Sequence, residues 1–515
     1  MKEESVEILR GLKCGGLEEQ AAALRRLVSL ESRSDGEYCS WLLEWLGLPG
    51  TQEAATVRAV IDEFLTSRSC AELVRVSQNC RPSYSYGGMT ASGYYRLEPR
   101  HLPILLGPPP GSPHLAGFLT FHPSGYVRET AIKHLSAHTG GLPYLLLRLN
   151  DWVPEVRRCA RDLLAKGESL VTPEQWVDNL PLVYRLLECG RDRHGEFVSH
   201  VEARLAQPDA LGALEAGCRH PRREVRRLCL PLAMQHTGRP FELLQQALKG
   251  DDVRIRFWVM EHFRSHLSDA QQRRALLREA LGNHSQVVRQ KALREWEQED
   301  PNDLEPFRGA LLDRSSGVRQ LAQYRLRESD LADFYRRRVA ENPLALVGLA
   351  ECGSSALPEI LVFLKHQDRR YRRRAALALT RLPVAEEVWL SLLADADPKI
   401  SKQARRALAY QSFARSGVER TALRSDYLHA RRNALYLLLR KGRNWERLLA
   451  AVEALTWEDR RLHNEARRGV SQALRHGKAN YVPPAEALQR WQELEPRLKV
   501  SLPQEVKTGI VRCLT

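Results

Sequence analysis

The sequence is poor in the patterns that build zinc sites, disulfide frameworks and membrane spans. Its 515 residues include ten cysteines, and no two of them are spaced as Cys-x-x-Cys. This argues against a zinc site of the usual spacing and against a disulfide framework, so we expect a reducing compartment, the cytoplasm. The charged first sixteen residues lack the apolar core of a secretory signal. The most apolar stretches, 142–149 and 434–441, are far shorter than a membrane span.

Familiar catalytic motifs are absent as well. The sequence has no Gly-x-Ser-x-Gly elbow and no Walker-type Gly-Lys-Ser/Thr motif, and none of its sixteen histidines is followed by Glu. His262 and His266 lie one helical turn apart, a spacing that can bind zinc, but no third ligand accompanies them. Cys159 and Cys229 lie in or beside an apolar stripe and are expected to pack as inert thiols. We therefore expect no enzymatic activity, no cofactor and no metal.

The net charge of +15 is distributed unevenly along the chain. Residues 1–365 hold 48 Lys and Arg against 47 Asp and Glu, whereas residues 366–515 hold 30 against 16. Because the excess of positive charge is confined to one end, it predicts an anionic partner there.

A short sequence motif recurs along the chain. It contains Val-Arg and, four residues after the Val, a small residue. The anchor residues that align with this Val are Val127, Val156, Val225, Ile255, Val288, Val318, Tyr371, Ile400, Ala430 and Leu462. Successive anchors are 29 to 33 residues apart except for gaps of 69 and 53 residues. We interpret each long gap as holding one degenerate repeat, near 190–205 and 343–360. A period of this length predicts a solenoid.

Each repeat reads as a pair of helices. The residues at the anchor, +4 and +8, for example Val156, Ala160 and Leu164, form one helical stripe, and the small middle residue lets a neighbouring helix approach. Five residues before the anchor, several repeats have a capping or turn residue, whose side chain can accept hydrogen bonds from free amides at the start of a helix. These residues are Asp151, Asn283, Asp313, Asp395 and Ser425. A second apolar helix precedes each of them, so every pair must bury its face against its neighbours.

The pattern resembles the HEAT-repeat family, in the short bacterial form named after phycobilisome lyases, over about residues 115–475. The resemblance implies an all-α fold, a right-handed α-solenoid of stacked antiparallel helix pairs. In that family the Asp and the Arg after the anchor commonly link adjacent repeats, and Asp151/Arg157 and Asp313/Arg319 match both positions. Ser401 and His463 replace the Arg, so we expect the links to weaken there.

Two groups of enzymes share this type of repeat. Di-iron hydroxylases of this kind resemble one another in paired His-Glu dipeptides, which the present sequence lacks. Alkylpurine DNA glycosylases stack HEAT-like pairs around a basic groove that needs an acidic residue and aromatic residues. Asp162, Tyr324 and Tyr436 occupy equivalent repeat positions, but this constellation is generic and those enzymes are much shorter. A glycosylase is therefore the least favoured of three functions.

The composition divides the chain into five segments. We expect a helical cap or divergent repeats over 1–78, near-neutral repeats over 117–365, strongly basic repeats over 366–475 and a closing cap over 476–515. Residues 79–116 are rich in Pro, Gly, Ser and Tyr and are expected to form an irregular insertion. Its possible contact residues are Tyr84, Tyr86, Tyr94 and Tyr95.

The second helix of each pair is expected to line the concave side, where positions +2, +5, +6 and +9 face solvent. In the basic repeats these positions, together with 369 and 370, predict a binding stripe. It comprises Arg369, Arg370, Arg373, Lys402, Arg405, Arg406, Arg432, Arg467 and Arg468, and Arg372 and Arg374 lie beside it. The favoured function is a non-enzymatic scaffold for a protein partner that is acidic in part, without membrane contact. The alternative is a DNA- or RNA-binding repair or defence component that uses the same stripe.

Overall fold

The computed structural model describes residues 65, 68–79, 97–106, 113–135, 140–327, 330–410, 415–418, 422–476 and 483–515. Regular secondary structure within these ranges is entirely helical, with no strand, and none of these helices could cross a membrane. The chain forms two compact units, residues 1–283 and residues 284–515. Most of the predicted cap over 1–78 lies outside the described residues, as do the four tyrosines of the 79–116 insertion. Where the insertion is described it includes a short helix, Leu102–Leu106.

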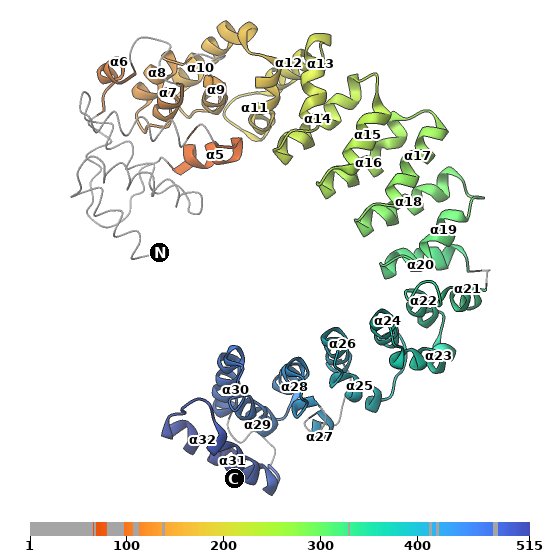
Figure 1. Ribbon diagram of the computed structural model, residues 1–515. Coiled ribbons are helices and arrows are strands. Elements are labelled where there is room, and N and C mark those ends of the chain that lie inside the picture. Colours follow the sequence, from red (N-terminus) through yellow and green to blue (C-terminus); the bar gives the residue numbers. More distant parts are fainter. Residues whose placement is uncertain are drawn as a thin grey trace. The chain divides into compact units, whose positions relative to one another are not determined.

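The first unit consists of paired helices that pack on the next pair along the chain (Figure 1). Its helices are α5 (Cys70–Asn79), α6 (Leu102–Leu106), α7 (Pro113–Leu119), α8 (Gly125–Lys133), α9 (Leu142–Arg148), α10 (Pro154–Gly167), α11 (Pro173–Arg185), α12 (Gly195–Leu205), α13 (Pro208–Gly217), α14 (Arg223–His236), α15 (Pro240–Lys249), α16 (Val253–His266) and α17 (Ala270–Leu281). Helices α8 and α10 pack together, as do α14 and α16, so the second helices of successive pairs are neighbours.

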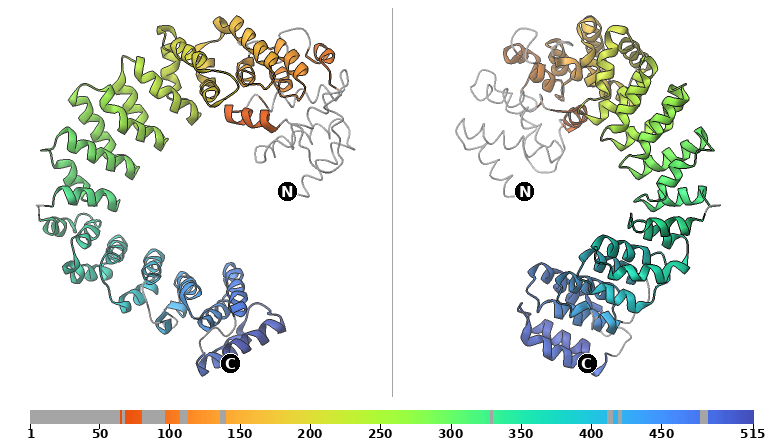
Figure 2. Two further views of the ribbon diagram at one scale, coloured as in Figure 1. Left: turned by 180° about the vertical axis from the view of Figure 1, so that it is seen from behind. Right: turned by 45° about the vertical axis from the view of Figure 1, so that its right-hand side comes forward.

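The second unit has the same construction. Its helices are α18 (Gln286–Glu299), α19 (Glu305–Ala310), α20 (Ser316–Arg325), α21 (Leu331–Arg338), α22 (Ala345–Glu351), α23 (Leu357–Val362), α24 (Arg369–Leu379), α25 (Glu386–Leu393), α26 (Pro398–Leu408), α27 (Arg415–Val418), α28 (Leu428–Lys441), α29 (Asn444–Ala454), α30 (His463–His476), α31 (Ala485–Leu494) and α32 (Gln504–Leu514). The even-numbered helices α18 to α30 form one row, on the inner side of this unit's curve, and α19 to α29 form the other (Figures 1 and 2).

Burial confirms the predicted helical stripe. Val156, Ala160 and Leu164 of α10 are at most 3% exposed, and the equivalent positions of α18 and α26 are similarly buried. Pro154 stands at the first turn of α10, where a missing N–H costs nothing. The two long gaps hold α11–α13 and α21–α23, and in the second gap α21 packs on α22 and α22 on α24, as expected for a degenerate repeat. Within each unit the described residues therefore form an all-helical stack of helix pairs.

The residues predicted as capping or turn residues lie two residues before the N-caps of the second helices and act as turn residues. The N-cap of α10 is Val153, and Asp151 Oδ1 instead accepts a hydrogen bond of 3.0 Å from the Val153 amide. Asp313 accepts one of 2.7 Å from the amide of Ser315, the N-cap of α20. Each of these carboxylates also binds an arginine of the preceding repeat. This second interaction holds the carboxylate in the loop, before the N-cap position.

This arginine–carboxylate bond joins consecutive repeats. Arg128 donates to both oxygens of Asp151, from Nε at 3.0 Å and from a terminal nitrogen at 2.8 Å, and both side chains are fully buried. Arg289 and Asp313 form the same two-bond pair, at 2.7 Å each. Arg128 also donates to the carbonyl oxygen of His122, six residues upstream. A single guanidinium thus ties its own loop to the loop of the next repeat.

The predicted Asp–Arg links between adjacent repeats are confirmed by Arg128–Asp151 and Arg289–Asp313, whereas Arg157 and Arg319 have other partners. Arg157 donates 2.7 Å to the main-chain oxygen of Asp151, while the carboxylate of Asp151 binds Arg128 of the preceding repeat. Arg319 likewise donates to the main-chain oxygen of Asp313 and pairs with Glu351 of a later repeat. In both cases the arginine after the anchor does not bind the carboxylate of its own loop.

The predicted weakening of the links is confirmed at both positions. Ser401 replaces the arginine on α26, and its hydroxyl accepts a hydrogen bond of 2.9 Å from Asn433 Nδ2 of α28 and donates one of 2.6 Å to Leu393 O. His463 lies with Nε2 3.0 Å from the carbonyl oxygen of Trp457 in its own loop. At these two positions hydrogen bonds without a carboxylate partner replace the arginine–carboxylate pair.

We expect Asp151→Ala to lower the free energy of unfolding by about 3–5 kcal/mol, because two buried arginines, Arg128 and Arg148, lose this carboxylate. Denaturant unfolding at neutral pH measures the change. Asp209→Ala removes a largely exposed pair with Arg204 and should leave the midpoint unchanged. If both variants lose the same small amount of stability, the buried pair does not hold the stack.

A second prediction concerns close packing at the end of α13. A Cβ at Gly217 would lie 2.5 Å from Cys229 Sγ and 2.8 Å from Val177 Cγ1, so Gly217→Ala should destabilise by about 1–3 kcal/mol. Gly212 of the same helix has no atom within 4 Å of its would-be Cβ. Gly212→Ala should therefore stabilise by about 0.5–1 kcal/mol. Thermal unfolding distinguishes the two, and equal effects would contradict the packing argument.

Candidate functional site

The candidate site is the row of helices α24, α26, α28 and α30, which we call the basic row. Helix α24 carries five arginines, α26 two lysines and two arginines, and α28 three arginines and one lysine, without any acidic residue on these three helices. Helix α30 carries three arginines and one acidic residue, Glu465. The opposite row differs, since α25 and α29 together carry four glutamates and one arginine. Charge is therefore segregated between the basic row and the two helices α25 and α29.

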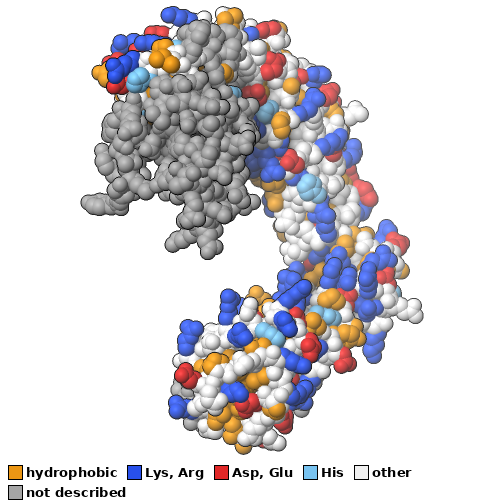
Figure 3. Space-filling view, turned by 60° about the vertical axis from the view of Figure 1, so that its left-hand side comes forward, with side chains coloured by type: hydrophobic (Ala, Val, Ile, Leu, Met, Phe, Trp, Pro, Cys, Tyr) orange, Lys and Arg blue, Asp and Glu red, His pale blue; other side chains and the backbone are white. Residues whose placement is uncertain are grey.

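Five of the predicted stripe residues are exposed, and no ion pair joins any of them to a carboxylate of the described residues. These five are Arg369, Lys402, Arg406, Arg467 and Arg468. Lys402 and Arg406 lie four residues apart on α26 and so share one face of that helix. Figure 3 shows Lys and Arg side chains gathered on the visible face of residues 284–515. These side chains remain available to an anionic partner.

Two other predicted stripe residues are bridges between repeats. Arg373 Nε donates 2.6 Å to Asp397, and Arg432 donates 2.9 Å to Asp459. Although burial raises the pKa of Asp397, the hydrogen bonds from Arg373 and from the Lys399 amide outweigh it and hold this pKa below its usual range. The positive charge of Arg373 and Arg432 is thus partly neutralised within the stack.

The last two predicted stripe residues, Arg370 and Arg405, also interact with other residues of the protein. Arg370 pairs at 2.8 Å with Asp368, the N-cap of its own helix. Arg405 places its guanidinium carbon 5.8 Å from the centre of the Tyr436 ring on α28, and its buried Nε has no hydrogen-bond partner among the described residues. Arg405 therefore packs against the neighbouring repeat and presents only part of its guanidinium to solvent.

A groove of about 400 Å³ lies between α24, α26 and the loop before α22. Its basic side chains are Arg370, Arg373, Arg374 and Lys399, and its apolar walls are Pro343, Leu344 and Leu377. Burial and the nearby charge of Arg319 lower the pKa of Arg374. Sequence reasoning missed Lys399 and Gln403, at −1 and +3 from the anchor, because only positions expected to face solvent directly were considered. The groove places these flanking positions beside the stripe.

The described residues offer little that could perform acid–base or metal chemistry. No group of three His, Cys, Asp or Glu among them could hold a metal ion. The ring of His262 stacks on Trp258, with 4.5 Å between ring centres, and its Nδ1 lies 2.9 Å from the Trp258 carbonyl oxygen. Burial and the neighbouring His262 lower the pKa of His266. His262 therefore packs against Trp258 of its own helix, α16.

The aromatic residues considered for a glycosylase site are separated along the row. Tyr324 belongs to α20 and Tyr436 to α28, with α22, α24 and α26 between them (Figure 1). Asp162 is an exposed residue of α10 in the other unit. Within residues 284–515 the two tyrosines do not share one cleft.

Comparison with known proteins adds a likeness in structure and none in sequence. No family model matches the chain, and no curated protein matches it in sequence. A chain in a crystal structure of importin beta, obtained in an ammonium sulfate condition, is 11% identical with a TM-score of 0.37, and the match covers 99% of this chain and 72% of that one. A chain in a structure of Kap95p with RanGDP is 12% identical with a TM-score of 0.29, covering 99% and 66%. At these values the likeness carries no functional information.

The buried cysteines allow a test of whether the chain holds a reactive thiol. Burial raises the pKa of Cys70 to about 11 and that of Cys218 to about 12, and it also raises the pKa of Cys229. At pH 8 the thiolate fraction of each is then about one in a thousand or less. We expect iodoacetamide to leave all three unmodified in the native protein and to modify them in urea, as read by peptide mass spectrometry. Rapid native labelling of Cys229 would contradict an inert packing role.

Proposed function

We propose that the chain is a non-enzymatic HEAT-like scaffold and that the basic row binds an acidic segment of a protein partner. The observation that supports this most directly is that α24, α26 and α28 carry thirteen basic residues and no acidic one. A surface of one sign attracts a partner of the opposite sign and orients it during encounter. The row also repeats its cations at the spacing of the helix pairs, which suits an extended ligand.

The groove beside the row favours a peptide over a nucleic-acid backbone. Leu344, Leu377 and Pro343 line it together with Arg374 and Lys399. An acidic peptide can place apolar side chains against such walls while its carboxylates contact the basic groups. A phosphate backbone offers no apolar side chain for these walls.

The same proposal includes the type of repeat and the cellular location. The repeat length of 29 to 33 residues supports the short bacterial type of HEAT-like repeat named after phycobilisome lyases. A cytoplasmic location is supported by the cysteines, because every cysteine among the described residues is a free thiol.

The test uses a fluorescent peptide of alternating Glu and Leu and a short DNA duplex as two probes. In Lys402→Glu/Arg406→Glu two exposed cations of α26 become repulsive, so peptide affinity measured by anisotropy should fall roughly tenfold or more. The matched control is Arg497→Glu/Arg512→Glu, which makes the same charge change at exposed arginines outside the basic row. The control should bind the peptide within about twofold of the unmodified chain.

Two results would overturn the proposal. If the duplex binds more tightly than the peptide, loses affinity with salt at a log–log slope of roughly −0.9 per phosphate contact, and is lost in the same variant, the row is a nucleic-acid site. If both variants bind both probes like the unmodified chain, the basic row is a solvated surface without a binding role.

A further inference from the structure

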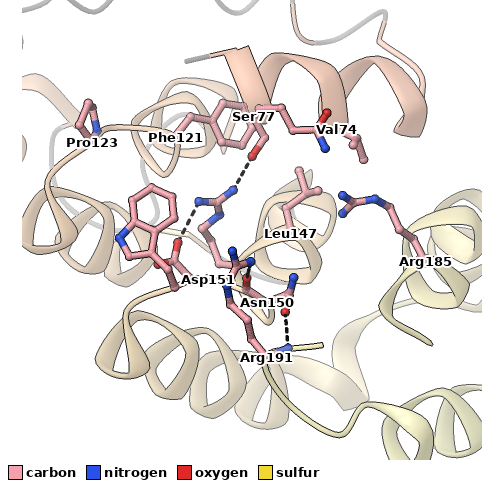
Figure 4. Close-up of a pocket in the computed structure, with 12 residues that line it drawn as sticks. Val74, Ser77, Phe121, Pro123, Leu147, Asn150, Asp151, Arg185 and Arg191 are labelled. Atoms are coloured by element: carbon pink, nitrogen blue, oxygen red, sulfur yellow. Dashed lines mark hydrogen bonds and ion pairs between the residues drawn. The ribbon is translucent and has the colours of Figure 1, made fainter. Parts of the chain in front are cut away.

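A second candidate site, far along the chain from the basic row, lies in the first unit. A cavity of about 700 Å³ opens between α5, α9 and the C-terminal end of α11 (Figure 4). Phe121 and Leu147 form apolar parts of its wall, and Trp152, which is 43% exposed, stands at its edge. A cavity of this size with an apolar wall and a few convergent polar groups is typical of small-molecule sites.

Positive charge dominates the polar side of this cavity. Arg148, Arg185 and Arg191 line it, and Asp151 is the only acidic residue among its described lining. Both oxygens of Asp151 are already used. Oδ1 accepts from Arg128 at 2.8 Å and from the Val153 amide at 3.0 Å, and Oδ2 accepts from Arg128 at 3.0 Å and from Arg148 at 2.9 Å. Asp151 is therefore saturated by the link between repeats and cannot neutralise Arg185 or Arg191.

The two remaining arginines reach the cavity from different segments. Arg185, at the end of α11, is half-buried and points toward Leu147 in Figure 4, and its side chain makes no hydrogen bond or ion pair with any described residue. Arg191 is fixed by its loop, because its amide donates to Asn150 Oδ1 at 3.3 Å and its guanidinium to Asn150 O at 3.2 Å. Two guanidinium groups are thus directed at one space without an internal counter-charge.

We propose that this cavity binds a small organic anion, with a phosphate or carboxylate held by Arg185 and Arg191 and a planar apolar group against Phe121, Leu147 and Trp152. The guanidinium fork matches both oxyanions in planar two-bond geometry. The apolar side chains of Phe121, Leu147 and Trp152 give the planar group a surface to pack on. This site is independent of the function of the basic row.

Calorimetric titration at low salt with phenyl phosphate, benzoate and phenol tests the site and separates its two oxyanions. Phenyl phosphate or benzoate should bind, and phenol should bind much more weakly. Arg185→Gln should weaken binding of the preferred anion roughly 10- to 100-fold, since it removes a charged hydrogen-bond donor. Arg193→Gln makes the same change at an exposed arginine near Arg191 that does not line the cavity, and it should change affinity less than about twofold.

A third variant separates loss of the site from loss of the fold. Arg185→Lys keeps the charge but loses the fork, and it should bind with an affinity between those of the unmodified chain and Arg185→Gln. Thermal unfolding of all variants without ligand should match the unmodified chain. Absence of binding by both anions at millimolar concentration, equal binding of phenol, or unchanged affinity in Arg185→Gln would each overturn the assignment.

Discussion

The buried bond between an arginine of one repeat and a carboxylate in a later loop is the interaction on which the stack depends. Apolar stripes alone hold helices together without fixing how one pair is placed against the next. The pair of Arg128 and Asp151 does fix it, because both groups are fully buried and each is costly to leave without the other. The same guanidinium also binds a carbonyl oxygen of its own loop. The Arg128 guanidinium therefore fixes the register between neighbouring repeats, the shape of the loop and the start of the next helix at once.

The parts of this structure that are local in sequence could be predicted from it. The stripe through Val156, Ala160 and Leu164 follows from helical spacing, and the period of the anchors implies the stacking. The links between adjacent repeats could be predicted, but spacing alone does not say whether Asp151 binds an arginine of the preceding repeat or of the following one, and the structure shows Arg128 of the preceding repeat. For the same reason Arg373 and Arg432 looked like free surface cations, whereas carboxylates of the next repeat engage them.

The cavity of the first unit shows a second limit of sequence reasoning. Its arginines are the last residues of α9 and α11 and one residue of the loop before α12, at positions 148, 185 and 191. Periodicity reveals features that recur, and this cavity occurs where the repeat is degenerate, near the long gap between anchors. Only the folded arrangement of α5, α9 and α11 brings these residues together.

The neutral link between Ser401 and Asn433 has a consequence for how the basic row could hold a ligand. Between α24 and α26 the joint relies on Arg373 and Asp397, so an incoming anion and the protein's own carboxylate compete for one guanidinium. Between α26 and α28 the joint contains the uncharged pair Ser401–Asn433. Neither Lys402 nor Arg406 forms an ion pair with a carboxylate of the described residues. An anion bound by Lys402 and Arg406 therefore does not compete with a carboxylate of the protein for the hydrogen bond that joins α26 to α28.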